Sequence, residues 1–187
     1  VDLNVMRPSI FPNLLSSINS NINKFFNNGK IFEVGPIFSN DNGQNQSMIC
    51  AGIIYGNAHS ISWNQNKRSV DIYDVKSDVY YLLEQLNVPI SNLVYEKSTN
   101  EFYHPGKSSN LRLGNTILAN FGEINPISLK KFNIKTTVCG FEVLLDNFGQ
   151  FQSKKSFTND NFSNFADKIN KKTIKMENGK KCCLKKS

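Results

Sequence analysis

The sequence is poor in the residues that build metal centres and disulfide frameworks. Its 187 residues include four cysteines and two histidines. The cysteines are Cys50, Cys139 and the adjacent Cys182 and Cys183, so no pair has the CxxC spacing typical of zinc sites. We therefore expect no bound metal. So few cysteines are typical of a reducing compartment such as the cytoplasm.

Long hydrophobic runs are also missing. The longest apolar stretch, Met48–Tyr55, is far shorter than the roughly 20 residues that a membrane helix needs. The first residues lack the basic region and apolar core of a secretory signal. We expect a cytoplasmic protein that does not enter a membrane.

Common catalytic motifs are absent as well. The sequence has no nucleophile elbow, no Walker loop, no HExxH and no glycine-rich dinucleotide fingerprint. A histidine occurs beside two turn-forming residues, at His104, Pro105 and Gly106. Because no motif in the sequence marks an acidic or nucleophilic partner for it, we predict a structural turn there and no catalytic centre.

Charge divides the chain into two parts. The net charge is +7, yet residues 1–151 hold equal numbers of basic and acidic side chains, and lysines of residues 152–187 supply the whole excess. That final segment has few large apolar residues, so burial cannot offset the entropy of ordering it. We predict a domain over residues 1–150 and a Lys-rich, disordered tail over residues 151–187.

Hydrophobic periodicity predicts an α+β fold. A helix is expected over 11–25, with Ser9 as its N-cap and apolar residues through Phe25 on one face. A second helix begins at Asp71, and a short one covers 126–132. Strands are expected over 30–38, 48–55, 92–97, 110–113, 116–121 and 137–145. The link Gly114–Asn115 predicts a hairpin, so an antiparallel sheet flanked by helices is favoured.

Six segments, read in order, resemble sequence blocks of one family. Val5–Leu15 is similar to MRxSLLPGLL, Ile31–Phe38 to LFEIGxVF, Asp71–Asp78 to DFFDLKGD, Tyr103–Ser108 to LHPGRSA, Asn120–Pro126 to xxGELHP, and Gly140–Leu145 to AFELDL. Together they identify residues 1 to about 150 as resembling the bacterial phenylalanyl-tRNA synthetase β subunit, within the catalytic-like domain of its C-terminal half.

This resemblance implies a class II aminoacyl-tRNA synthetase-like fold without catalysis. Active class II domains carry Phe-Arg-x-Glu directly after the strand that corresponds to Ile31–Phe38. Here those positions read Phe38, Ser39, Asn40 and Asp41, so a hydroxyl replaces the arginine that would neutralise the reacting phosphate. Residues 136–151 also lack the arginine of the other class II signature. We expect no catalytic residues and no cofactor bound by this segment.

The family assigns the segment a role in assembly. Its α subunit holds the working active site, and the α/β heterotetramer uses ATP and magnesium to attach phenylalanine to tRNA(Phe). We expect the α subunit as partner, with tRNA(Phe) engaged through the complex. Packing residues are expected to serve either the subunit interface or the domain's own core: Met6, Phe11, Leu14, Ile18, Ile31, Phe32, Val34 and Phe38.

Two other hypotheses remain open from the sequence. A scaffold domain with a basic RNA-binding tail would explain the lysines of residues 152–187. A free-standing adenylate-forming ligase would require catalytic arginines that are missing here. The family also continues into an anticodon-binding domain, which residues 158–187 do not resemble, so we expect a chain truncated before that domain.

Overall fold

The computed structural model describes residues 6–38, 45–58, 67–98 and 100–148. Six strands form one sheet in the order β1-β2-β6-β5-β4-β3, and every neighbouring pair is antiparallel. The strands are β1 Gly29–Phe38, β2 Gln46–Tyr55, β3 Leu93–Lys97, β4 Tyr103–Leu113, β5 Thr116–Ile124 and β6 Val138–Leu144. The helices are α1 Phe11–Asn23, α2 Ile72–Gln85 and α3 Pro126–Lys131, with 3-10 turns at Ile90–Asn92 and Leu145–Phe148.

The predicted α+β class with an antiparallel sheet is confirmed. Each of the six predicted strands is present, and the hairpin through Gly114 and Asn115 joins β4 to β5. β1 forms one edge of the sheet, as expected from Pro36, which has no N–H to donate to a second neighbour. The last strand, β6, lies between β2 and β5, so the strand latest in the sequence occupies the interior of the sheet.

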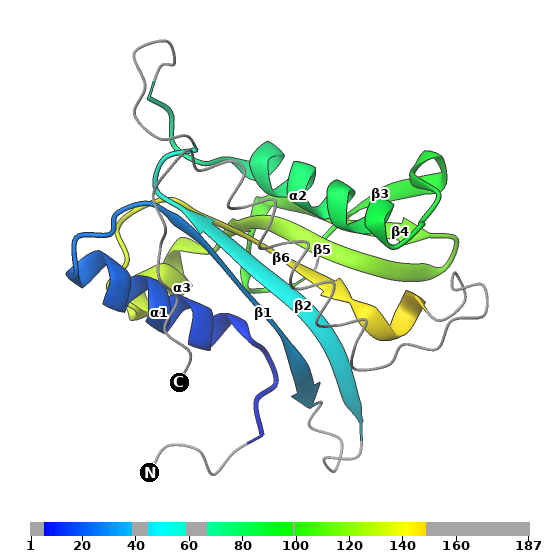
Figure 1. The fold of residues 1–187 in the computed structure, drawn as a ribbon, viewed down its shortest axis with the longest axis horizontal. Coiled ribbons are helices and arrows are strands. Elements are labelled where there is room, and N and C mark those ends of the chain that lie inside the picture. Colours follow the sequence, from blue (N-terminus) through cyan, green and yellow to red (C-terminus); the bar gives the residue numbers. More distant parts are fainter. Residues whose placement is uncertain (1–5, 39–44, 59–66, 99, 149–187) are drawn as a thin grey trace. The chain divides into compact units, whose positions relative to one another are not determined.

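Helices cover both faces of the sheet (Figure 1). α1 and α3 lie on one face, where Phe11, Leu14 and Ile18 pack against alternate residues of β2 such as Ile49 and Ile53. α2 lies on the opposite face and packs on β5 and β6 through Val75, Val79, Leu82 and Leu83. Below, the first is called the α1 face and the second the α2 face.

The first helix differs from the prediction at both ends. Its N-cap is Ile10 and not Ser9; the Ser9 hydroxyl instead accepts a hydrogen bond from the Phe11 N–H at 3.2 Å. The helix ends at Asn23, before Phe25, which has φ +66° and is 89% exposed. The spacing of Phe25 is helical, but the chain must turn there to enter β1, so its side chain leaves the buried face.

The second helix begins as predicted at Asp71. The Asp71 and Asp74 carboxylates form a capping box, and Arg68 pairs with both of them. Asp78, one turn further on, pairs with Lys30 of β1. Asp71 and Asp74 therefore share Arg68 as a partner, whereas Asp78 pairs with Lys30.

The turn predicted at His104, Pro105 and Gly106 is wrong, because these residues do not connect two elements. These residues lie inside β4, in the irregular stretch where pairing with β5 breaks between Tyr103 and Ser108. There the His104 Nδ1 accepts a hydrogen bond from the Gly106 N–H at 3.1 Å, and the Ser108 hydroxyl donates to the His104 carbonyl. The Pro105-Gly106 pair therefore lies in a bulge within one strand and not in a turn between two elements.

Some predictions fall outside the described residues. Ser39, Asn40 and Asp41 lie there, as does the whole of the predicted tail over 151–187 with the truncation expected in it. Among the described helices, none has the length and apolarity needed to span a membrane.

Candidate functional site

A row of polar side chains crosses the α1 face from one sheet edge to the other. Residues that are directly paired on neighbouring antiparallel strands point to the same face. The strand registers place six residues in one line, which we call the polar row: Glu33, Ala51, Glu142, Asn120, Asn110 and Glu96. Ala51 belongs to the core under α1, which identifies the face. Apart from this alanine, every member carries a carboxyl or an amide.

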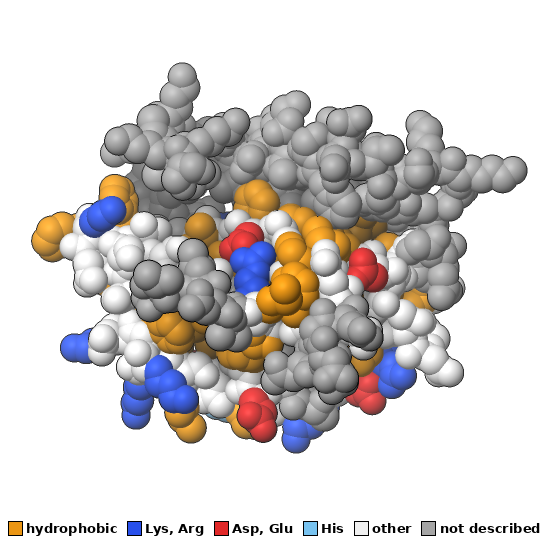
Figure 2. Space-filling model, turned by 90° about the horizontal axis from the view of Figure 1, so that it is seen from below, with side chains coloured by type: hydrophobic (Ala, Val, Ile, Leu, Met, Phe, Trp, Pro, Cys, Tyr) orange, Lys and Arg blue, Asp and Glu red, His pale blue; other side chains and the backbone are white. Residues whose placement is uncertain are grey.

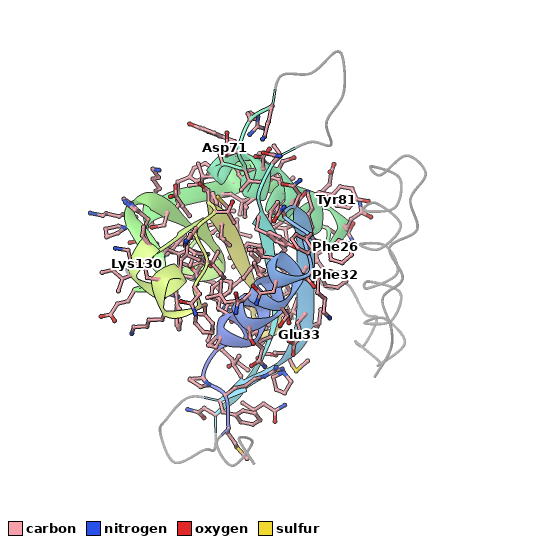
Figure 3. The ribbon with its side chains drawn as sticks, turned by 90° about the vertical axis from the view of Figure 1, so that its left-hand side faces the viewer. Phe26, Phe32, Glu33, Asp71, Tyr81 and Lys130 are labelled. Carbon is pink, nitrogen blue, oxygen red and sulfur yellow. The ribbon has the colours of Figure 1, made fainter. Side chains whose placement is uncertain are left out.

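Arginines neutralise the acids at both ends of the polar row. At the β1 edge, Arg7 pairs with Glu33 and also donates to the Pro36 carbonyl at 3.0 Å. At the β3 edge, Arg112 pairs with Glu96 at 2.9 Å. Figure 3 shows Glu33 on β1 below α1. The chain contains three arginines. The third is Arg68, so all three are engaged by carboxylates.

The central carboxyl has no such partner. Glu142 is 8% exposed, and two neutral groups bond to it: the Ser9 hydroxyl, which donates to Oε1 at 3.5 Å, and the Asn120 side chain. Burial raises the pKa of Glu142 to about 7, against the smaller lowering effect of these two hydrogen bonds. Burial therefore favours the neutral form of the Glu142 carboxyl.

A buried tyrosine lies beside this carboxyl. The Tyr103 hydroxyl donates to the Asn120 carbonyl at 3.4 Å, and its ring meets Phe11 edge to face, with centroids 5.6 Å apart. Burial, with the nearby Glu142 charge as a second cause, raises the pKa of Tyr103 well above its usual range. Tyr103 therefore stays protonated and acts as a donor.

The amides of the polar row are incompletely satisfied. Asn110 Oδ1 and Asn120 Oδ1 are buried without a hydrogen-bond partner, and so is Arg112 Nε. A buried acceptor without a donor costs about 1–3 kcal/mol. The middle of the sheet therefore carries buried polar side chains that lower the stability of the domain compared with apolar side chains at the same positions.

The predicted packing residues fall into two groups that differ in how far their side chains are buried. Phe11, Leu14 and Ile18 are buried in the domain's own core, and the partly buried Ile31 packs against it. Phe32, Val34 and Phe38 on the edge strand are half-buried, and Met6 is 63% exposed. The half-buried and exposed residues thus lie along β1 and just before α1.

Five of the six segments quoted from the sequence meet around the polar row. The first supplies Arg7 and Ser9, the second Glu33 and the fourth Tyr103. The fifth and sixth supply Asn120 and Glu142. Sequence reasoning did not select these polar residues, because it weighed the blocks as packing elements. A single acid inside an otherwise apolar strand, as in Phe141-Glu142-Val143, was the available signal.

Metal ligands do not gather in the part of the chain that is described. Within it, no three His, Cys, Asp or Glu side chains lie close enough together to hold an ion. Cys50 and Cys139 are free, buried thiols, and burial raises the pKa of each to about 12. Neither is a nucleophile at neutral pH.

Known proteins match most of the chain. Residues 1–145 match the family described as phenylalanyl tRNA synthetase beta chain CLM domain. A phenylalanine–tRNA ligase beta subunit from Rhodospirillum rubrum is 37% identical over 145 residues, which cover 78% of this chain and 18% of that protein. The beta subunit from Wolbachia sp. subsp. Brugia malayi is 39% identical over 148 residues, or 79% of this chain and 18% of that protein.

A solved structure confirms the class of fold. A pyrrolysyl-tRNA synthetase from Desulfitobacterium hafniense matches with a TM-score of 0.58 and 17% identity, over 76% of this chain and 48% of that one. At this identity the likeness concerns the fold alone, which is class II synthetase-like as predicted.

The relatives decide between the hypotheses that the sequence left open. They favour neither the free-standing ligase nor the scaffold with an RNA-binding tail, because the match is to one subunit of a ligase over most of the chain. The chain spans about a fifth of their length, 18% in each case. With residues 1–145 matched, the chain belongs to the family of phenylalanyl-tRNA synthetase β chain CLM domains.

Proposed function

We propose that this chain is the catalytic-like domain from the C-terminal half of a phenylalanyl-tRNA synthetase β subunit, and that it serves assembly with the α subunit. In that complex, ATP and magnesium drive the attachment of phenylalanine to tRNA(Phe), and the domain binds neither cofactor itself. Its place is the cytoplasm, which the free Cys50 and Cys139 thiols support. The observation that carries the proposal is the family match over residues 1–145.

The ion pairs of the three arginines support the proposal that this domain does not activate an amino acid. Activating an amino acid with ATP develops negative charge on phosphate oxygens, which a free guanidinium stabilises by two parallel hydrogen bonds. Arg7, Arg68 and Arg112 are the only arginines of the chain, and each is already paired with a carboxylate. Position 39 offers a serine hydroxyl where the class II signature has arginine.

We therefore expect the purified chain to show no phenylalanine-dependent exchange of pyrophosphate into ATP. The loss of one charged contact of this kind costs roughly a hundredfold or more in rate. The assay uses the full chain alone, with an intact α/β enzyme as positive control. Exchange that disappears in a Ser39→Ala variant would contradict catalytic silence.

Exposed apolar groups at both ends of β1 support the assembly role. Phe25 and Phe26 precede the strand and are 89% and 56% exposed, and Met6 lies near its far end, where the Phe38 N–H bonds to the Arg7 carbonyl. Figure 3 shows Phe26 and Phe32 on the same side of the domain. Figure 2 shows the underside of Figure 1, toward which β1 ends, with hydrophobic side chains gathered around a few charged ones. Such apolar exposure along one edge is typical of a protein interface.

Binding of the cognate α subunit is expected to depend on this edge. Phe26→Asp should weaken the affinity at least tenfold, because a carboxylate would be desolvated in the contact. Val94→Asp is the matched control: Val94 is 60% exposed, but it lies on β3 at the opposite edge. Sedimentation velocity of mixtures gives the affinities. Equal binding by both variants, or no binding by the wild-type chain, would refute an α contact along β1.

A further inference from the structure

A polar pocket lies at the end of the sheet where β2 finishes and β6 starts. Its volume is about 510 Å³, which falls within the roughly 300–1,000 Å³ of small-molecule sites. The α1–β1 turn, the residues after β2 and the segments that precede α2 and β6 form its walls. Of the described residues around it, Ile22 alone has a large apolar side chain. We call it the lysine pocket, after Lys67 and Lys135 in its walls.

Hydrogen bonds hold the walls of the lysine pocket together. The Asn57 N–H donates to Asn28 Oδ1 at 2.8 Å, which joins the end of β2 to the turn before β1. The Gly56 N–H donates to the Thr137 carbonyl at 3.4 Å, next to the start of β6. The Val70 N–H donates to the Gly56 carbonyl at 3.0 Å, which ties in the segment before α2. The pocket is therefore formed before any ligand enters, which lowers the entropic cost of binding.

Neutral donors line the lysine pocket. Because Asn28 Oδ1 accepts the Asn57 N–H, the other end of this amide is the NH₂ group, a donor. We find no acceptor for that NH₂ group among the described residues. The hydroxyls of Ser69 and Thr136 line the same pocket and likewise form no hydrogen bond with a described residue. Three groups able to donate a hydrogen bond are thus available to a ligand.

The two lysines bring positive charge that no carboxylate balances. Lys67 and Lys135 reach the pocket from different segments, and both are exposed. Neither forms an ion pair with a described residue. Arg68, which follows Lys67, does not line the pocket and instead pairs with Asp71 and Asp74. Two unpaired ammonium groups therefore line one polar pocket.

A second pocket, which shares Ser69 with the first, shows the opposite arrangement. Lys107 and Glu123 both line it and form an ion pair at 2.7 Å, and Asp71 lines it as well. Its positive charge is thus balanced within the pocket. By contrast, none of the described residues that line the lysine pocket is acidic. The charge of the lysine pocket therefore favours an anion.

We propose that the lysine pocket binds a phosphate group, for which free phosphate and an RNA phosphodiester are the two sources. Phosphate oxygens accept hydrogen bonds from several directions, and their bonds to ammonium groups are about twice as strong as bonds between neutral groups. Lys67 and Lys135 supply such bonds from two walls, and the Asn28 amide and the Ser69 hydroxyl supply neutral ones. This binding goes beyond the assembly role and does not require the α subunit.

The direct test is a titration of the nitrogen-15-labelled full chain with inorganic phosphate, followed by NMR. Chloride keeps the ionic strength constant, because salt screens exposed charges. We expect saturable shifts of the backbone amides of Asn57, Ser69 and Thr136. Shifts that do not saturate, or that chloride alone reproduces, would overturn the proposal.

Three variants separate the pocket from general surface charge. Lys67→Ala and Lys135→Ala should each weaken phosphate binding by about fivefold or more, because each removes one charge-assisted bond. Both side chains are exposed, so neither substitution disturbs the core. Lys97→Ala is the matched control: it removes an exposed lysine of β3, which β5 and β4 separate from β6, and it should bind like the wild type. Equal weakening in all three variants would refute the lysine pocket.

A short single-stranded RNA oligonucleotide distinguishes the two sources of phosphate. If the pocket takes a phosphodiester, the RNA should shift the same amides and compete with inorganic phosphate. If it takes free phosphate, the RNA should leave those amides unshifted, and the saturable phosphate titration carries the proposal. An RNA effect on these amides that persists in Lys67→Ala and Lys135→Ala would place the binding outside the pocket and contradict its phosphodiester form.

Discussion

Replacing Phe11 with alanine is expected to destabilise the domain by about 3–5 kcal/mol, which is the usual cost of removing a buried phenylalanine side chain. Phe11 is fully buried at the start of α1. Its ring contacts two aromatic neighbours, Phe102 at 5.9 Å and Tyr103 at 5.6 Å between centroids. The cavity cannot close easily, because Gly140 beneath the ring belongs to the central strand β6. At about 2–4 °C per kcal/mol, the melting temperature should fall by about 10 °C.

The chain offers a matched control for this variant. Phe25 follows the same helix, shares its apparent periodicity, and is 89% exposed. Phe25→Ala should therefore change stability by less than about 0.5 kcal/mol. Urea unfolding followed by circular dichroism measures both variants. A cost below about 1 kcal/mol for Phe11→Ala would show that α1 is not anchored by this ring.

A second large effect is expected at Gly56, just after β2. Its φ of +83° is accessible to glycine but strained for other residues, at about 1–2 kcal/mol. A Cβ there would also be driven into the Asn27 carbonyl oxygen and the Asn28 side chain. The Asn27 oxygen is backbone and cannot rotate away, so the turn between α1 and β1 would have to move away from the end of β2. We expect Gly56→Ala to cost about 3–5 kcal/mol, combining strain and overpacking.

The Gly114→Ala variant measures the cost of backbone strain in the absence of a steric clash. Gly114 in the β4–β5 hairpin has φ +60°, and a Cβ there would meet nothing within 4 Å. Its substitution should cost about 1–2 kcal/mol, from backbone strain alone. Thermal unfolding of the two variants gives the difference directly. Equal costs would mean that the approach of Asn27 to Gly56 is not a close contact in solution.

Local patterns were sufficient to predict the elements. Apolar residues at spacings of three and four marked α1 and α2, and Gly114–Asn115 marked the hairpin, because these signals act between residues close in sequence. They were less reliable where an element meets its neighbour. Phe25 and Ser9 each continue a valid local pattern, yet the turn into β1 and the reach of Ser9 to β6 override it.

What the sequence by itself determined is therefore the α+β class, the antiparallel pairing and the family, since each depends on composition, periodicity or ordered blocks. The tertiary structure alone decided that β6 lies between β2 and β5. That placement brings Glu142 next to Ser9, 133 residues away in sequence, and aligns it with Asn120. No local pattern encodes such a meeting, because strand order is selected by how all the apolar faces are buried together. The neighbours of the buried Glu142 carboxyl come together only once the whole sheet has formed.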